Sequence, residues 1–192
     1  MLSLKQLLTP KKKIFFMIGI ISIIVIAYSS TSFATIFAGG RSSANFNAYY
    51  DSSVAIYGYS GAYDSARADW NAASGSVNIG KTTSTSGNPD KYYVGTTATT
   101  GLLGVTTPYN SSGGVVGVSD TWAYATVAIY DNQMNDYYMS GPERISNATH
   151  EVGHTLSQAH PVTSQSSVMK QGIQSIGVQT WDKESLISKW GN

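Results

Sequence analysis

Cysteine is absent from the 192-residue sequence, and several kinds of chemistry are excluded with it. A thiol nucleophile, a thiolate zinc site and a disulfide framework all need cysteine side chains. Charge is also scarce: Asp, Glu, Lys and Arg make up 12% of the chain, and after residue 13 no lysines or arginines cluster. We therefore expect no nucleic-acid partner and no binding to an anionic membrane surface, because both need a basic patch.

Long hydrophobic runs are absent except near the N-terminus. Four lysines, the last at residue 13, precede an uncharged apolar run of fifteen residues at 14–28, and the small residues Ser32 and Ala34 follow. This is the layout of a secretory signal peptide, and the run is shorter than the roughly 20 residues that a membrane-spanning helix needs. We predict that residues 1–34 are a signal peptide removed after Ala34 and that the protein is secreted and extracellular. If the segment is retained, the bacterial cell surface is the expected location.

The rest of the chain predicts one domain. Without residues 1–34 it carries eight basic and eleven acidic side chains, and hence a net charge of about −3. Residues 35–44 are rich in Gly and Ser, which favours a short flexible N-terminal segment. Residues 45–192 contain no linker long enough to separate two domains. We expect a single domain there, monomeric and free of the membrane once the signal peptide is removed.

Turn residues and hydrophobic periodicity divide this domain into strands and helices. Stretches rich in β-branched and aromatic residues, bounded by Gly, Pro, Asn or Asp, predict strands, and apolar residues three and four apart predict helices. The predicted strands are residues 48–59, 76–83, 91–97, 101–107 and 121–130, and the predicted helices are 60–74, one that begins at Ser140, and 180–190. The helix at Ser140 opens with a capping box, Ser-x-x-Glu, and has Pro142 in its first turn. The pattern predicts an α+β domain with layers of helix and sheet.

All three histidines of the chain, His150, His154 and His160, lie within eleven residues on the predicted helix and its exit. Together with Glu151 they form H-E-x-x-H followed by a third histidine six residues on. Residues four apart on a helix project from one side, so His150 and His154 can reach the same ion. Imidazole nitrogens are common zinc ligands, and a glutamate beside them is a candidate general base. H-E-x-x-H also occurs by chance in helices that bind nothing, but here every histidine of the chain has ligand spacing.

The other face of this helix carries an apolar stripe. Its members are Ile145, Ala148, Val152 and Leu156, and counting about 100° per residue places them roughly opposite the two helical histidines. We therefore predict that this face packs on the sheet, while the histidines face a cleft with room for water and substrate.

Residues 150–160 resemble the metzincin signature H-E-x-x-H-x-x-G-x-x-H, and Ser167-Val168-Met169 resembles the Met-turn of that clan. The order of the predicted strands and helices is similar too, over nearly the whole chain after the signal peptide. The resemblance implies a metzincin-like fold: a twisted mixed five-stranded sheet with an antiparallel edge strand, an active-site helix, a Met-turn and a C-terminal helix.

The resemblance also implies a role for each residue that matches the motifs. The three histidines would hold Zn²⁺, and Glu151 would act as general base on a metal-activated water. Met169 would pack beneath the imidazoles without touching the ion. By order along the chain, residues 101–107 are the candidate edge strand, along which an extended peptide would lie.

Three features of the sequence bear on how close the resemblance is. Ser157 stands where the metzincin signature has glycine. If the turn there needs a positive φ, serine lowers the stability of the fold by roughly 1–2 kcal/mol relative to glycine. A gluzincin-like site with a downstream acid such as Glu184 as third ligand is the competing assignment, although the order of elements and the Met-turn both favour histidine. Lys170 and Gln171 follow Met169 in place of a tyrosine ligand, so the chain resembles matrixins more than astacins or serralysins.

These observations favour a secreted zinc metalloendopeptidase that acts on protein or peptide substrates. The main alternative is a secreted binding or effector protein that keeps the fold and the zinc but cleaves nothing, and the presence of Glu151 speaks against it. A membrane-tethered structural protein is a third alternative if the N-terminal segment stays uncut. The sequence leaves open the preferred substrate, a requirement for Ca²⁺ and the means of latency.

Overall fold

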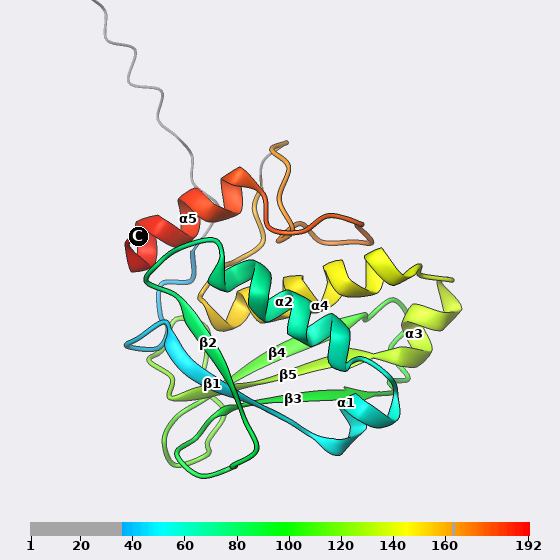
Figure 1. Ribbon diagram of the computed structural model, residues 1–192, viewed down its shortest axis with the longest axis horizontal. Helices are drawn as coiled ribbons and strands as arrows, with labels where there is room; N and C mark the ends of the chain where they lie inside the picture. Colours follow the sequence, from blue (N-terminus) through cyan, green and yellow to red (C-terminus); the bar gives the residue numbers. More distant parts are fainter. Residues whose placement is uncertain (1–35, 163) are drawn as a thin grey trace, which may run out of the picture. The chain divides into compact units, whose positions relative to one another are not determined.

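The structure of the protein is a computed structural model that describes residues 36–162 and 164–192 (Figure 1). The predicted signal peptide, residues 1–34, lies outside the described residues. Within the described ranges, no helix is both long enough and apolar enough to cross a membrane.

Five strands form one mixed sheet in the described part of the chain. They are β1 (Asn45–Tyr50), β2 (Asn78–Thr82), β3 (Asp90–Gly95), β4 (Gly104–Tyr109) and β5 (Tyr124–Tyr130). In the order β2-β1-β3-β5-β4, the first four strands run parallel, and β4 pairs antiparallel with β5 at one edge. The prediction of an α+β domain is confirmed, and the strand expected at 101–107 corresponds to the antiparallel edge strand β4.

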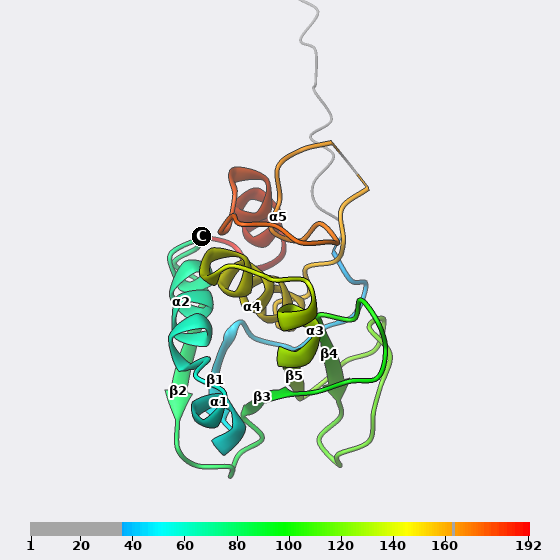
Figure 2. The same cartoon turned by 90° about the vertical axis from the view of Figure 1, so that its right-hand side faces the viewer.

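Helices accompany the sheet, and two of them form its main cover. The described helices are α1 (Ser52–Ile56), α2 (Ser60–Asn71), α3 (Asp131–Asp136), α4 (Gly141–Thr155) and α5 (Thr180–Trp190). α2 and α4 lie side by side over one face of the sheet (Figures 1 and 2). Trp70 of α2 is fully buried and donates its Nε1 hydrogen to the carbonyl of Thr149 in α4 over 2.8 Å. α2 therefore holds α4 in place from one side.

The capping box and the apolar stripe predicted for α4 are largely present. Ser140 and Glu143 form the capping box, and Ala148, Val152 and Leu156 are fully buried. Ile145 is 36% exposed, so the stripe prediction is wrong at that residue. Near the start of α4 the buried residue is Ser146 instead.

The strand predicted at 48–59 is wrong beyond Tyr50. The Asp51 side chain accepts a hydrogen bond from the Ser53 backbone N–H over 2.9 Å and caps the short helix α1. The Tyr, Val and Ile content of this stretch favoured a strand, but strand propensity depends on context and a local N-cap overrides it here. Neither α1 nor α3 was predicted from the sequence.

Residues 36–44 make long-range contacts with the rest of the domain, although their Gly and Ser content favoured a flexible segment. The Phe37 N–H donates to the Ser157 carbonyl over 2.9 Å. The Arg41 guanidinium forms a buried ion pair with Asp90 over 2.6 Å. Backbone hydrogen bonds and one ion pair join this segment to residues far along the chain, and composition does not reveal such contacts.

Candidate metal centre

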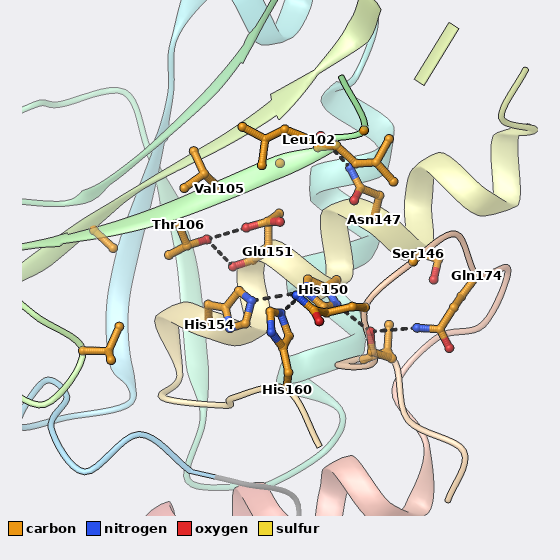
Figure 3. A pocket seen from close by; sticks show the side chains of 18 of the residues that line it. Leu102, Val105, Thr106, Ser146, Asn147, His150, Glu151, His154, His160 and Gln174 are labelled. Carbon is orange, nitrogen blue, oxygen red and sulfur yellow. Dashed lines mark hydrogen bonds between the residues drawn. The ribbon is translucent and has the colours of Figure 1, made fainter. Parts of the chain in front are cut away.

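The structure brings the three histidines of the sequence together at one point. His150 and His154 project from α4 one turn apart, and His160 returns to them after the chain has left the helix (Figure 3). The Nε2 atom of His150 lies 3.0 Å from Nε2 of His160 and 3.2 Å from Nε2 of His154. Nitrogens at such separations can share one cation, because tetrahedral zinc with Zn–N bonds of about 2.0–2.1 Å places its ligand nitrogens about 3.3 Å apart.

The outer nitrogens of the two helical histidines are held by backbone carbonyls. Nδ1 of His150 lies 2.8 Å from the Val168 carbonyl oxygen, and Nδ1 of His154 lies 2.7 Å from that of Gln158. A carbonyl oxygen only accepts, so each Nδ1 carries the proton and each Nε2 presents a lone pair. The Nε2 lone pairs of His150 and His154 therefore lie close together and repel each other, and a cation between them would turn this repulsion into attraction. The donor set therefore fits a metal ion, and zinc suits neutral imidazole.

Burial keeps these imidazoles neutral. It lowers the pKa of His150 to about 4. Burial, followed by the neighbouring His150, lowers the pKa of His154 to about 3. Burial also lowers the pKa of His160. At neutral pH the three rings are therefore in the neutral form, with a free nitrogen lone pair, that a metal requires.

Glu151 lies between the helical histidines and faces the edge strand. Its side chain is buried, and its Oε2 accepts a hydrogen bond from the Thr106 hydroxyl over 3.0 Å (Figure 3). A Cβ atom on Gly104 would lie 2.6 Å from Cγ of Glu151, so glycine there lets β4 approach the carboxylate. Burial raises the pKa of Glu151 to about 8, and the hydrogen bond from Thr106 opposes that shift.

Ser157 makes the turn that brings His160 back to the helix. Its φ is 64°, in the left-handed region that favours glycine, and its N–H donates to the His154 carbonyl over 3.0 Å. The side chain is fully buried, and among the described residues its hydroxyl has no hydrogen-bond partner. By contrast, Glu184 is exposed on α5 and is not part of the described cluster that could hold a metal. The geometry thus favours His160 over Glu184 as the third ligand.

Replacing Ser157 with Gly is expected to stabilise the protein by about 1 kcal/mol, because a serine side chain is strained at positive φ. The expected rise in melting temperature is about 2–4 °C in thermal unfolding without metal. Ser157→Ala removes the unpartnered hydroxyl but keeps the Cβ atom, so its melting temperature should rise less than that of Ser157→Gly. A lower melting temperature for Ser157→Gly would contradict the assignment of strain to this turn.

Met169 is fully buried against α4. A side chain on Gly153 would collide with Sδ of Met169 and with the ring of Trp70, so the methionine packs directly on the helix between its two histidines. Asp182 of α5 holds the turn formed by residues 167–169. Sequence patterns did not indicate Asp182 as a site residue. Its carboxylate accepts from the Ser167 hydroxyl and from the Val168 N–H, and it thereby fixes the carbonyl that orients His150.

A cleft of about 410 Å³ runs between β4 and α4 and contains the histidines. Apolar side chains also line it, among them Leu102, Leu103, Met139, Phe37, Val118 and Trp122. Asn147 also lines the cleft, and its side-chain amide donates to the Leu103 carbonyl over 3.1 Å. A polar cluster in a cleft lined by apolar side chains is the usual make-up of a ligand site.

No family model and no curated protein matches this chain. Among the solved structures that match, one chain of the "GM1 bound form of the ECX AB5 holotoxin" aligns over 76% of this chain and 80% of its own length. The two are 15% identical, with a TM-score of 0.49. A likeness of this degree identifies neither a family nor a function, so the functional proposal rests on the geometry of the site.

Proposed function

We propose that the protein is a secreted zinc-dependent endopeptidase of the metzincin kind, most similar to matrixins. One observation carries the proposal: the Nε2 lone pairs of His150 and His154 converge with Nε2 of His160, beside Glu151, in an open cleft. The arrangement of α4, the turn at Met169, α5 and the edge strand β4 around this cluster supports it.

The three histidines would hold the ion through Nε2, with Nδ1 of His150 and His154 bonded to carbonyls behind them. When bound, zinc supplies Lewis acidity, which acidifies water and polarises a peptide carbonyl. The charge of a bound zinc ion would lower the pKa of Glu151 from the value that burial gives it, so that its carboxylate could accept the proton of the attacking water and pass it to the leaving amine. The Thr106 hydroxyl lies 2.7 Å from the Glu151 carbonyl oxygen and 3.0 Å from Oε2, and from there it would help to orient the carboxylate.

The edge strand β4 offers a place for the substrate backbone. Among the described strands β4 pairs only with β5. At the end of β4 its other side is already bonded to residues 115–116, through the Pro108 carbonyl, while Gly104 to Thr106 border the cleft. An extended peptide added to that side would be held by main-chain hydrogen bonds, which do not depend on sequence. Apolar side chains that line the cleft would contact substrate residues near the cleaved bond.

Metal analysis and a cleavage assay test the proposal together. We expect the full chain to bind one zinc ion and to cleave casein or a quenched-fluorescence peptide library, with activity lost on chelation and regained on adding Zn²⁺. Cleavage that is indifferent to chelator would contradict a metal mechanism. Zinc bound without cleavage of any peptide would contradict the proposal in favour of a binding or effector protein.

Thr106→Val is expected to lower kcat by about 10–100-fold, since a hydrogen bond to a charged group contributes roughly 1.5–3 kcal/mol and about 1.4 kcal/mol is a factor of ten. Thr106→Ser keeps the hydroxyl and should retain most of kcat. The affinity for zinc should stay unchanged in both variants, because Thr106 contacts Glu151 and no histidine. Steady-state kinetics with separate kcat and KM values provide the measurement. A wild-type kcat in Thr106→Val would show that Thr106 does not support catalysis by Glu151.

A further inference from the structure

The N-terminal strap, defined here as residues 36–41, runs beside the turn that leads to His160. Ile36 forms an antiparallel bridge with Gln158, and the Phe37 N–H donates to the Ser157 carbonyl over 2.9 Å. The strap therefore pairs with the backbone of two residues, the turn residue Ser157 and Gln158 after it. One of them, Gln158, supplies the carbonyl that holds Nδ1 of His154.

The Phe37 side chain contacts the metal site directly. Its ring stacks on the His154 imidazole with a centroid distance of 5.6 Å and an interplanar angle of 23°. Its ring also meets Trp122 edge-on, with centroids 6.4 Å apart, and both aromatic residues line the cleft. Phe37 thus covers one face of a ligand ring and limits its rotation.

Further contacts anchor the rest of the strap. The Lys189 ammonium of α5 donates to the Gly39 carbonyl over 3.1 Å, and the Gly40 N–H donates to the Asp120 carbonyl over 3.0 Å. Gly40 has a φ of 141°, and a side chain there would collide with the Ser157 hydroxyl. The close approach of strap and turn therefore depends on glycine at position 40.

We propose that the strap is part of the metal centre and that Phe37 is a positioning residue for His154. The inference rests on the proposed metal site but not on proteolysis. The strap is hydrogen-bonded to the backbone of residues 157–158. This backbone orients His154 through the Gln158 carbonyl and leads two residues later to His160. The Phe37 ring restrains the His154 imidazole from its face. Cleavage at the predicted signal-peptide site, after Ala34, would leave the whole strap on the mature protein.

Zinc affinity of the full chain provides the first test. Phe37→Ala should weaken zinc binding by about tenfold, within the roughly 10–100-fold that loss of an outer partner of a metal ligand costs. Phe37→Tyr keeps the ring and should bind zinc like the wild type. Tyr138→Ala is the matched control, because it also removes an aromatic ring but one that is 92% exposed. Competition with a chromophoric chelator measures all four proteins.

A metal-free measurement separates positioning from general loosening. In the NMR spectrum of the apoprotein, the Nδ1 proton of His154 should exchange faster with water in Phe37→Ala, while that of His150, bonded to the Val168 carbonyl, should not change. Unchanged zinc affinity with an unchanged His154 signal would overturn the inference, and so would equal loss of both signals. If the wild type binds zinc but cleaves nothing, the proposed function fails while the role of Phe37 is still decided by these two readouts.

Discussion

Glu151→Gln is expected to remove most peptide cleavage while leaving the metal site intact. Glutamine has nearly the same shape, and its carbonyl oxygen can still accept the hydrogen bond that Thr106 donates to Oε2 in the wild type. It cannot take a proton from water, so kcat should fall by about 10²–10⁴-fold, the usual contribution of a general base. Zinc affinity should stay close to wild type, because Glu151 is not among the clustered ligand residues.

Three measurements together decide this prediction: kcat on a quenched peptide, bound zinc by metal analysis, and the melting temperature of the zinc-loaded protein. Glu184→Gln is the control, since it makes the same chemical change at an exposed position of α5. Full activity in Glu151→Gln would show that another group moves the proton. Lost activity accompanied by lost zinc would show a structural effect instead of a catalytic one.

His160→Ala should lower the affinity for zinc by more than about 100-fold, because losing even an outer partner of a ligand costs roughly 10–100-fold. The two remaining nitrogens, Nε2 of His150 and of His154, would be the only imidazole ligands at the site. Zinc stabilises a protein that binds it only when folded, so the wild type should gain thermal stability with added zinc and His160→Ala should not.

The matched variant for this prediction is Glu184→Ala, which removes the acid that a gluzincin-like site would use. We expect it to bind zinc as the wild type does, because Glu184 is exposed on α5 and does not belong to the histidine cluster. Zinc retained in His160→Ala but lost in Glu184→Ala would reverse the assignment of the third ligand.

The parts of the fold predicted best are those governed by local periodicity and capping. The capping box of α4, its two histidines one turn apart, and the apolar spacing that predicted α2 all involve residues at most four positions apart. Position 157 was predicted conditionally: a positive φ was expected to strain serine, and the structure has a φ of 64° there. Where local signals conflicted, as at residues 48–59, the N-cap at Asp51 outweighed the strand-forming residues that follow it.

The contacts that hold the candidate ligands in place could not be predicted in this way. Thr106 meets Glu151 from 45 residues away, and Asp182 reaches the Met169 turn from the next helix. Gly and Ser content suggested a loose N-terminal segment, yet the strap lies against a turn more than a hundred residues later in the chain. Composition does not predict such pairings, because they depend on where the chain returns in space.

The sequence by itself determined which groups are available for chemistry: three imidazoles and a carboxylate at helical spacing, with no thiol to compete with them. Spacing along a helix is a local property, so it can be read without a fold. Only the tertiary structure decided how those groups are held, with carbonyls of Val168 and Gln158 behind two imidazoles, Thr106 on the carboxylate, and Phe37 against His154. These partners come from separate strands, turns and the N-terminal strap, and folding the chain is what brings them within hydrogen-bond and van der Waals distance of the site.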